Sequence, residues 1–476
     1  MNLPLYRRIA DALAEKLDRG EWPAGTRLPA VRQLARQHNV NVLTALQAYR
    51  WLEERHRIVA RPRSGFYAAT PALAVDNDQE TSLPSPGAWV HVDDRLTNLL
   101  TLSASNIDTQ LHMAEADTAL YPAAEFARRL QHKLQRDPTL IGTYLPARET
   151  ALLKGELIRL ASSWQLQLPS EHILMTNGTT EAIQLALRAL TQPGDVVAVE
   201  TPVYFGQLQM LENLGLKALE IPCTPEQGLS LEALEFALRH GPPIRCLLVV
   251  PNFQNPTGAL MPDENKKRLL ELARQFHLPV IEDDVFGDLH HEGDRPTPIK
   301  AWDREGQVIY CTGFTKSFAP AFRLGWLSGG QHHARIERLK ISSSYVTSPL
   351  MQATLADCLA SGLYARHIER FRQQLCLQTR QLIECVRHSF PKATVISAPK
   401  GGMLLWIRGP EGMDSMSLLD QALPCSISFA PGPVFSAEGR FSRYLRLNAG
   451  HPWSKDLEQA VRRLGALAAQ QCATGR

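Results

Sequence analysis

The chain has 476 residues, 44% of them hydrophobic and 21% charged, a composition that excludes a mostly disordered protein and predicts large hydrophobic cores. Because single domains usually contain about 50–250 residues, this length predicts two or more domains. The net charge of +3 is unevenly distributed: residues 1–70 contain twelve Lys or Arg and six Asp or Glu, hence +6, which leaves −3 for the rest. A basic first domain favours a polyanionic partner, although an ordinary solvated surface would have the same composition.

The cysteines and the apolar segments indicate the cell compartment. No two cysteines form a C-x-x-C pair or share a metal-ligand spacing with histidines, so we expect reduced thiols and no metal site. The amino-terminal stretch lacks the apolar run of a signal peptide, and no segment reaches the roughly 20 apolar residues of a membrane span. We therefore expect a soluble, cytoplasmic protein with no membrane partner. The cysteines are Cys223, Cys246, Cys311, Cys358, Cys376, Cys385, Cys425 and Cys472.

The first 57 residues contain three helical patterns. In PLYRRIADALAEKLDRG, Ile9, Leu13 and Leu17 recur every four residues between a proline and a glycine, which predicts one amphipathic helix. The segments AVRQLARQHNV and NVLTALQAYRWLEERHR predict two more helices, with a break at residues 38–39. The predicted order is helix, helix, tight turn, helix.

A short hairpin pattern follows the third helix. In IVARPRSGFYAA, apolar residues alternate with polar or basic ones around Ser64 and Gly65. Three helices and a hairpin make a winged helix-turn-helix, whose third helix enters the major groove of double-stranded DNA while the wing approaches phosphates or the minor groove. We expect the contacts to come from the start of the second helix, the first turn of the third helix and the wing. These residues are Arg27, Arg32, Asn41, Thr44, Arg61, Arg63 and Gly65.

This stretch resembles the GntR-type winged helix over its whole length. The matching segments are PLY at 4–6, AGTRLPAVRQLA at 24–35 and RPRSGFY at 61–67. One departure is Val42, where the family usually has an arginine or another polar residue that contacts DNA. The alternative is a three-helix protein-interaction module with a basic face.

The composition changes near residue 70. From there to about 105, Pro, Ser, Asp and Thr replace the hydrophobic periodicity, as in a tether that lets two domains move independently. We therefore predict a DNA-binding domain at 1–70, a linker at 71–105 and a large second domain at 106–476.

The large domain alternates helical patterns with short apolar runs. Such runs predict a largely parallel sheet covered by helices on both faces, with ligands bound beyond the carboxyl ends of the strands. The runs are HILMTN, VVAVE, ALEIP, CLLVVP, PVIED and QVIYCTG, between residues 172 and 313.

Three motifs at predicted strand ends are suited to a flat phosphorylated ligand. In MTNGTTEAIQ, Gly178 allows a tight turn, and Thr179 and Thr180 open a helix whose free amides would attract phosphate, although the same letters form an ordinary helix cap. Tyr204 in VETPVYFG would stack on a heteroaromatic ring, or simply pack in the core. Asn255 in NFQNPTG would point its amide at the same ligand, or only form a turn.

Two further motifs define the chemistry. PVIEDDVFGDL places Glu282, Asp283 and Asp284 at a strand end, where a buried carboxylate needs a partner such as a protonated pyridine nitrogen. An acidic metal patch that includes His290 and His291 is the alternative.

The second is CTGFTKSFAPAFRLGW, in which Lys316 supplies an amine for a Schiff base and Arg323 a bidentate grip on phosphate. Together the five motifs predict pyridoxal 5′-phosphate.

From about residue 110 to 470 the chain resembles the fold-type I aminotransferases. The resemblance implies that Gly178, Thr179 and Arg323 hold phosphate. It also implies that Tyr204 stacks on the ring and that Asn255 bonds to the phenolic oxygen. Asp283 would pair with the pyridine nitrogen, and Lys316 would form the Schiff base. The segment RYLRLNAG resembles the one whose arginine binds the substrate carboxylate, which assigns that role to Arg446.

Three positions depart from the family pattern. Phe286 replaces a tyrosine that donates to the phenolic oxygen, which should weaken the hold on the cofactor. Gly313 replaces a hydroxyl residue that contacts phosphate, so Thr312 or Thr315 would have to substitute. The loop GTYLPARET matches poorly the segment that reaches a neighbouring subunit, where Tyr144 is the corresponding residue.

A GntR-type reader joined to an aminotransferase-like body resembles the MocR family of bacterial transcriptional regulators. The resemblance implies a homodimer whose body senses an effector. An amino acid or amine would replace Lys316 in the Schiff base, engage Arg446 and alter DNA binding. Two alternatives are a working aminotransferase with a DNA-binding appendage and a body that only dimerises.

Overall fold

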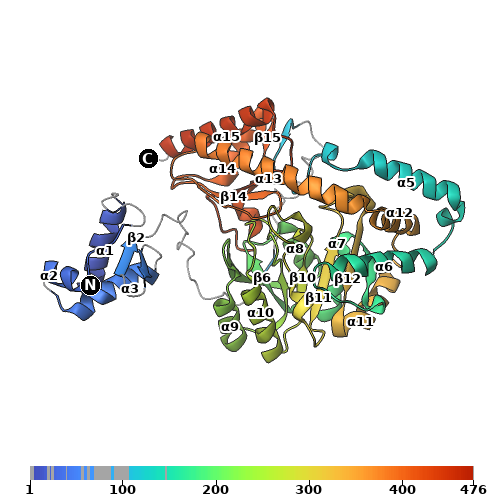
Figure 1. Cartoon of the computed structure of the whole chain (residues 1–476), viewed down its shortest axis with the longest axis horizontal. Coiled ribbons are helices and arrows are strands. Elements are labelled where there is room, and N and C mark those ends of the chain that lie inside the picture. The colour runs from blue at the N-terminus through green and yellow to red at the C-terminus, as the bar shows by residue number, and fades with distance from the viewer. Residues whose placement is uncertain are drawn as a thin grey trace. The chain divides into compact units, whose positions relative to one another are not determined.

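The computed structural model divides into two compact units, Met1–Glu80 and Thr81–Arg476 (Figure 1). The structure describes residues 5–18, 22, 26–38, 40–54, 58–61, 65–68, 87–90, 107–144 and 147–474.

The first unit contains three helices and a two-stranded hairpin. Its apolar residues at helical spacing form a small core in which Leu13, Leu34 and Leu52 are buried. The elements are α1 Leu5–Asp18, α2 Val31–Gln37, α3 Val42–Glu54, β1 Ile58–Arg61 and β2 Gly65–Ala68.

The hairpin is fixed to the helices from two sides. Leu28 N donates to Phe66 O at 2.8 Å, and Arg27 forms a bridge with Tyr67, so the segment before α2 extends the hairpin. The Tyr49 hydroxyl, buried on α3, donates to a backbone carbonyl before α2, and its ring lies 4.7 Å from that of Phe66. The predicted winged helix-turn-helix is confirmed.

The second unit is built on a large mixed sheet. The strands run in the order β3-β7-β6-β9-β10-β11-β12-β5, with β8 paired to β7. The neighbours from β7 to β11 are parallel, whereas β12 is antiparallel to both β11 and β5. The bounds are β3 Ala88–Trp89, β5 Leu174–Asn177, β6 Val196–Thr201, β7 Lys217–Thr224, β8 Gly228–Leu229, β9 Ile244–Val249, β10 Val280–Asp283, β11 Val308–Gly313 and β12 Leu324–Ser328.

Helices cover both faces of this sheet. Along β6, Val197 and Val199 pack in the core beneath α7, α8 and α11, whereas Val196 and Ala198 pack in the core beneath α9 and α10. This alternation is the reason why the central strands read as continuous apolar runs. The helices are α7 Gly178–Leu190, α8 Phe205–Asn213, α9 Leu231–His240, α10 Asp263–Gln275 and α11 His333–Ser343.

A carboxyl-terminal lobe follows the sheet. It contains a four-stranded antiparallel sheet of order β13-β14-β17-β16, and the long helix α13 Leu363–Ser389 leads into it (Figure 1). The other elements are β4 Thr109–Gln110, α5 Ala123–Arg136, α6 Ala147–Ser162, α12 Pro349–Ala360, β13 Val395–Ile396, β14 Leu404–Arg408, α14 Ser415–Ala422, β15 Ile427–Ser428, β16 Ala430–Pro431, β17 Tyr444–Asn448 and α15 Lys455–Thr474.

One segment of the predicted linker differs from a free tether. Residues 87–90 belong to the second unit, where Ala88 and Trp89 pair antiparallel with the edge strand β7 and Val90 is buried in the core. The exposed backbone of an edge strand is a template for such pairing. The rest of the predicted linker, at 71–86 and 91–105, lies outside the described residues.

The expectations about the cysteines and about membrane-spanning segments can be compared with the structure. All eight cysteines are free thiols. Among the described helices, none is long and apolar enough to span a bilayer.

The topology brings six strand ends to one edge. The strands β6, β9, β10 and β11 are parallel, and β5 has the same direction because it is separated from β11 by the single antiparallel strand β12. The carboxyl ends of these strands and the amino end of β12 therefore lie together. Except for Arg446, the predicted ligand residues of the second unit lie at these strand ends. The sheet topology alone therefore brings them together.

Candidate functional site

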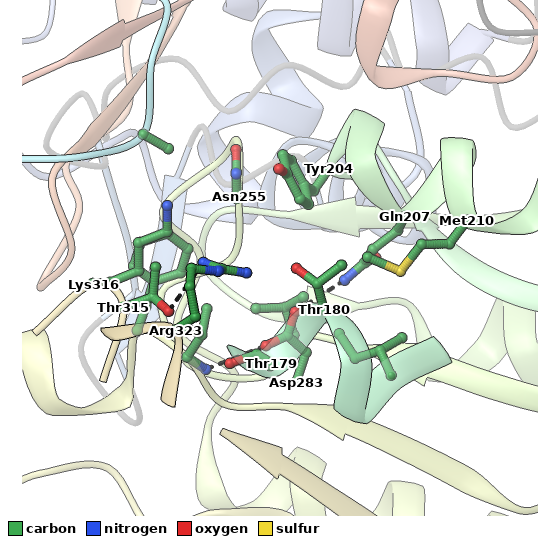
Figure 2. A pocket seen from close by; sticks show the side chains of 15 residues that line it. Thr179, Thr180, Tyr204, Gln207, Met210, Asn255, Asp283, Thr315, Lys316 and Arg323 are labelled. Carbon is green, nitrogen blue, oxygen red and sulfur yellow. Dashed lines mark hydrogen bonds between the residues drawn. The ribbon is translucent and has the colours of Figure 1, made fainter. Parts of the chain in front are cut away.

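A cavity of about 280 Å³ opens at this edge of the sheet (Figure 2). Its volume is near the lower end of the range for small-molecule sites, about 300–1,000 Å³, so it is suited to a ligand with a single ring. Eight of the nine residues predicted to bind the cofactor line it. The ninth, Gly178, lies against the side chain of Arg323, which is one of those eight. The lining residues are Ala114, Thr179, Thr180, Ile183, Tyr204, Gln207, Met210, Val250, Asn255, Asp283, Val285, Phe286, Thr315, Lys316 and Arg323.

The amino end of α7 forms one wall. Gly178 has a φ of 79°, and a Cβ atom there would lie 2.8 Å from Arg323 Nη2, so only glycine permits this approach. Thr179 Oγ1 is buried and has no hydrogen-bond partner within the described parts of the chain. Free amides at a helix start, an unpartnered hydroxyl and a guanidinium together make an anion cradle.

The structure shows why a glycine, Gly313, stands three residues before Lys316 in place of the family's hydroxyl residue. A Cβ atom at Gly313 would lie 2.9 Å from Thr179 Oγ1, so any side chain here would occupy the space of that hydroxyl. Thr312 does not substitute, because its hydroxyl donates to Asp284 O at 3.0 Å. Thr315 lines the cavity and accepts a 3.5 Å hydrogen bond from Arg323 Nη1.

The three consecutive carboxylates at the end of β10, Glu282 and Asp283 in the strand and Asp284 just after it, have separate roles because side chains alternate along an extended backbone. Glu282 accepts hydrogen bonds from the backbone of Ile299 and Lys300 at 2.7 and 2.9 Å. Asp284 pairs with Arg295 at 2.6 Å. Both are therefore satisfied within the fold.

The acidic-patch alternative is not supported by this geometry. Over the described ranges, no group of three His, Cys, Asp or Glu side chains could hold a metal ion. His290 and His291 point elsewhere, towards Arg372 and the carbonyl of Gly402 respectively.

Asp283 is the carboxylate that faces the cavity. It accepts hydrogen bonds from Gln207 Nε2 at 3.2 Å and from Val285 N at 3.3 Å. Burial raises its pKa from 3.8 to about 7, because neither bond offsets the loss of water. A cationic partner in the cavity would favour the charged form and reverse this shift.

Lys316 follows β11 and projects into the same cavity (Figure 2). Burial lowers the pKa of its amine to about 8, and the opposing attraction of Glu115 is smaller. Arg446 and Arg323 lower this pKa further. A lysine with a pKa near 8 is partly neutral at physiological pH, as a nucleophile requires.

Aromatic side chains form the remaining walls. The ring of Tyr204 lies over Gly206, where a Cβ atom would be 2.5 Å from the ring. Phe286 is buried in the wall and offers no phenolic donor to the cavity.

Arg446, on β17 of the carboxyl-terminal lobe, is not among the residues that line the cavity, but it contacts Asn255, which is. Its side chain is fully buried, and its Nη1 donates to Asn255 Oδ1 at 2.8 Å while Nη2 donates to the carbonyl of His112. Burial lowers its pKa to about 10. Its Nε has no hydrogen-bond partner in the part of the chain that the structure describes, so the guanidinium retains an unused donor.

Sequence reasoning missed two residues that hold predicted site residues in place. Gln207, which holds Asp283, lies three residues after Tyr204 on the first turn of α8, a spacing that places both on one side of the helix start. Gly206 admits the tyrosine ring. The signal for both was the segment YFGQ itself, since a glycine in a helical pattern requires an explanation.

Tyr144 lies outside the cavity. It is 73% exposed and packs edge-on against Tyr345, whose ring is 6.1 Å away. Its predicted contact concerns a neighbouring subunit and stays a prediction.

In the first unit, Asn41 caps α3. Its Oδ1 accepts from Thr44 N at 2.7 Å and from Thr44 Oγ1 at 2.8 Å. Arg27 is exposed, as is Val42 at 46%. Gly65 begins β2, and Arg61 ends β1.

The other predicted DNA contacts lie wholly or in their side chains outside the described part of the structure. Arg32 belongs to α2, but its side chain, like that of Arg61, is outside what the structure describes, and Arg63 lies outside the described residues. All of these residues stay predicted contacts.

Two family models match the chain. The model for aminotransferase class I and II matches residues 112–464, and the model for bacterial regulatory proteins of the gntR family matches residues 5–68.

Full-length relatives combine the same two parts. The chain is 36% identical over 473 residues to the Escherichia coli HTH-type transcriptional regulator YjiR, covering 97% of this chain and 98% of the relative. It is 26% identical to the probable rhizopine catabolism regulatory protein MocR of Rhizobium meliloti, over 90% of this chain and 87% of the relative.

Solved structures resemble the second unit. The α-aminoadipate aminotransferase LysN of Thermus thermophilus, complexed with N-(5′-phosphopyridoxyl)-L-leucine, has a TM-score of 0.74 and 26% identity over 81% of this chain and 97% of its own. The kynurenine aminotransferase of Pyrococcus horikoshii has a TM-score of 0.73 and 26% identity over 80% of this chain and 95% of its own.

These matches define a helix-turn-helix transcriptional regulator with an aminotransferase-like domain of fold type I. Regulators with this combination form the MocR family, and the chain belongs to it.

Proposed function

We propose that the second unit binds pyridoxal 5′-phosphate and senses a small amino compound that controls DNA binding by the first unit. One observation carries this proposal: Lys316, Asp283, Asn255 and Arg323 meet in one cavity, where their ligand-facing groups are only partly satisfied by the protein. A merely dimerising body has no need of such a set.

The residues of the cavity fit this cofactor group by group. The buried, unpartnered Thr179 hydroxyl, the amides at the start of α7 and Arg323 would hold its phosphate, with Thr180 and Thr315 at the rim. The cradle at Gly178 supports the same assignment, because a Cβ atom there would displace Arg323.

The ring and the aldehyde have their own partners. Asp283, held by Gln207, would pair with the pyridine nitrogen; Tyr204 would cover the ring and Asn255 would bond the phenolic oxygen. When bound, the cofactor supplies an aldehyde that condenses with amines and a ring that withdraws electrons. The Lys316 amine would carry this aldehyde in the resting protein.

The effector would bind beside Lys316 and compete with it for the aldehyde. Arg446 would recognise a carboxylate, since its guanidinium has an unused donor and is held on Asn255 next to the cavity. The proposed effector is therefore an amino acid or a related amine. A ligand shifts DNA binding only if it favours one arrangement of the protein over another.

A homodimer is part of the proposal. Ile141 and Tyr144 are 75% and 73% exposed, and Tyr345 packs against Tyr144 while it is itself 49% exposed. Ile341, four residues before Tyr345, is 54% exposed. An exposed aromatic pair, with an exposed isoleucine near each tyrosine in the sequence, supports an interface between copies, which would present two DNA-binding units to double-stranded DNA in the cytoplasm.

A working aminotransferase is the second candidate. The pKa of about 8 at Lys316 favours it, because a partly neutral amine can move protons near physiological pH. Phe286 favours the sensor, since the phenolic donor of the family pattern is missing. Turnover of amino acids with 2-oxo acids at about 1 per second or more would support the enzyme instead.

The decisive measurement is the visible absorption spectrum of the purified protein and of Lys316→Ala, with and without a panel of amino acids. A band that is absent from the variant, and that one ligand shifts without release of a 2-oxo acid, supports a sensor. Absence of the band from both proteins would contradict cofactor binding.

A further inference from the structure

The long helix α13 connects two hydrophobic cores. Its first half places Tyr364, Phe371 and Leu375 in the core that also contains Phe314 and Phe318, on either side of Lys316. Its second half places Leu382 and Val386 in the core of the carboxyl-terminal lobe. Figure 1 shows this helix running from the lobe towards α12. The helix therefore packs against the core that contains Phe318 at one end and against the carboxyl-terminal lobe at the other.

Two side chains of α13 hold the residue next to Lys316. His367 Nε2 lies 2.9 Å from the carbonyl oxygen of Ser317, and because a carbonyl only accepts, this nitrogen carries the proton. The hydroxyls of Tyr364 and Ser317 are hydrogen-bonded at 3.4 Å. Ser317 is 1% exposed, so both bonds are shielded from water.

The hydroxyl of Tyr364 also bonds to a network of charged side chains. Its hydroxyl donates to Asp288 Oδ2 at 2.6 Å, and Arg295 bridges Asp288 at 2.7 Å and Asp284 at 2.6 Å. Asp284 is the neighbour of Asp283. This series of bonds thus links the residue after Lys316 to the residue after Asp283. Lys316 and Asp283 are themselves the groups that would hold opposite parts of the cofactor.

Burial restricts the arrangements that this hydrogen-bonded network can adopt. The guanidinium of Arg295 lies 3.8 Å from the centre of the Trp164 ring and is 7% exposed, and Asp284 is fully buried. In such surroundings an unpaired polar group is costly, so the chain has few alternative arrangements. Neither Tyr364 nor His367 lines the cavity, and both reach the neighbour of Lys316 through their bonds to Ser317.

We propose that Tyr364 and His367 are positioning residues for Lys316, and that through Ser317 and α13 they couple the bound or free state of the lysine amine to the carboxyl-terminal lobe that carries Arg446. This inference rests on the proposed function, because it requires that Lys316 carries the cofactor aldehyde. It gives the sensor a route from the cavity to a separate part of the molecule.

The test compares two defined probes on the full chain. Pyridoxal 5′-phosphate has the aldehyde that Lys316 can bind, whereas pyridoxamine 5′-phosphate has none and leaves the lysine free. We expect amide hydrogen exchange in the first turns of α13, around Tyr364 and His367, to differ between the two complexes of the wild type. Equal exchange in the two complexes would overturn the inference.

Variants assign the effect to the two side chains. Tyr364→Phe and His367→Leu should abolish the difference in exchange, and His367→Gln, which keeps an N–H donor, should restore it. Tyr121→Phe is the matched control, because Tyr121 packs against His367 and Phe371 but does not bond Ser317. A wild-type difference that survives both Tyr364→Phe and His367→Leu would exclude these residues as the coupling.

A spectroscopic readout separates this inference from the function on which it rests. The pH at which the lysine-dependent visible band changes should shift in Tyr364→Phe and stay unchanged in Tyr121→Phe, whereas a loss of stability alone would leave it unmoved. If the wild type has no such band, the proposed function fails and this inference with it. If the band is present but α13 does not respond, only this inference fails.

Discussion

Arg446 Nη1 donates a 2.8 Å hydrogen bond to Asn255 Oδ1, which joins the carboxyl-terminal lobe to the strand-end loop after β9. The two residues are 191 positions apart in the chain. Because Arg446 is fully buried, a ligand carboxylate that reaches it would find a charge that water does not screen. Asn255 would then contact the cofactor and fix the arginine that recognises the effector.

Replacement of Arg446 tests this dual contact. Arg446→Lys keeps the charge but loses the fork that bonds two partners. We expect carboxylate-bearing amino compounds to shift the visible spectrum at concentrations roughly 10- to 100-fold higher, because a hydrogen bond to a charged group contributes about 1.5–3 kcal/mol. Simple amines should be unaffected, and an equal loss for both ligand classes would contradict a carboxylate site.

The pKa of Lys316 predicts how cofactor loading depends on pH. Only the neutral amine attacks an aldehyde, and burial lowers the pKa from 10.5 to about 8. The rate of pyridoxal 5′-phosphate capture by the apoprotein should therefore rise with pH and level off above about 8. A rate that continues to rise towards pH 10 would show an ordinary exposed lysine. Lys316→Ala gives the background rate.

Asp283 and Asp284 should respond oppositely to the same substitution. The folded Asp283 carboxyl has a pKa of about 7 against 3.8 unfolded, so it binds its proton more tightly when folded, and its ionisation opposes folding increasingly between pH 4 and 7. Asp283→Asn should therefore stabilise the apoprotein at pH 7.5 while it weakens cofactor binding.

Asp284→Asn leaves the buried Arg295 without one of its two carboxylates and should cost about 3 kcal/mol of unfolding free energy. Chemical denaturation of both apoproteins gives the comparison. If Asp283→Asn were the more destabilising of the two, the separate roles assigned to these two carboxylates at the end of β10 would be wrong.

Much of this site could be predicted from the sequence because the chemistry lies at strand ends. Gly178, Tyr204 and Lys316 each follow an apolar run, and parallel strands must present their carboxyl ends at one edge. The strand pattern alone therefore places these residues at one edge of the sheet. The winged helix was predictable for a similar reason, since its helices and hairpin are local in sequence.

Contacts between distant segments were not predictable. Nothing in the sequence near Asp284 indicates that Arg295 would be its partner or that Tyr364 would join the same chain. The role of Gly313 emerges only when Thr179, more than a hundred residues away, is seen in the space above it. The short strand β3 is not predictable from the sequence, because two residues carry no periodicity.

Gly178 and Gly194 provide a matched pair for the phosphate cradle. Both have positive φ, at 79° and 90°, so an alanine should cost each about 1 kcal/mol of stability. Only at Gly178 does the new Cβ atom meet Arg323, whereas nothing lies within 4 Å at Gly194. Affinity for pyridoxal 5′-phosphate should fall in Gly178→Ala and remain in Gly194→Ala. Equal affinities would show that Arg323 does not need this close approach.

Asn41 caps a helix in the first unit and is also a predicted DNA contact. Its Oδ1 caps α3 through Thr44, and the remaining amide nitrogen is the group that we expect to reach DNA. Asn41→Ala should cost about 1 kcal/mol of stability, whereas Asn41→Ser keeps a capping oxygen and so preserves the fold of this unit.

Titration of the full chain with its operator at fixed ionic strength then isolates the DNA contact. Asn41→Ser should weaken operator binding by about 1–3 kcal/mol and leave binding to random DNA unchanged, because base contacts supply specificity and phosphate contacts supply the common affinity. If Asn41→Ser binds the operator like the wild type while Asn41→Ala does not, Asn41 acts only as a helix cap.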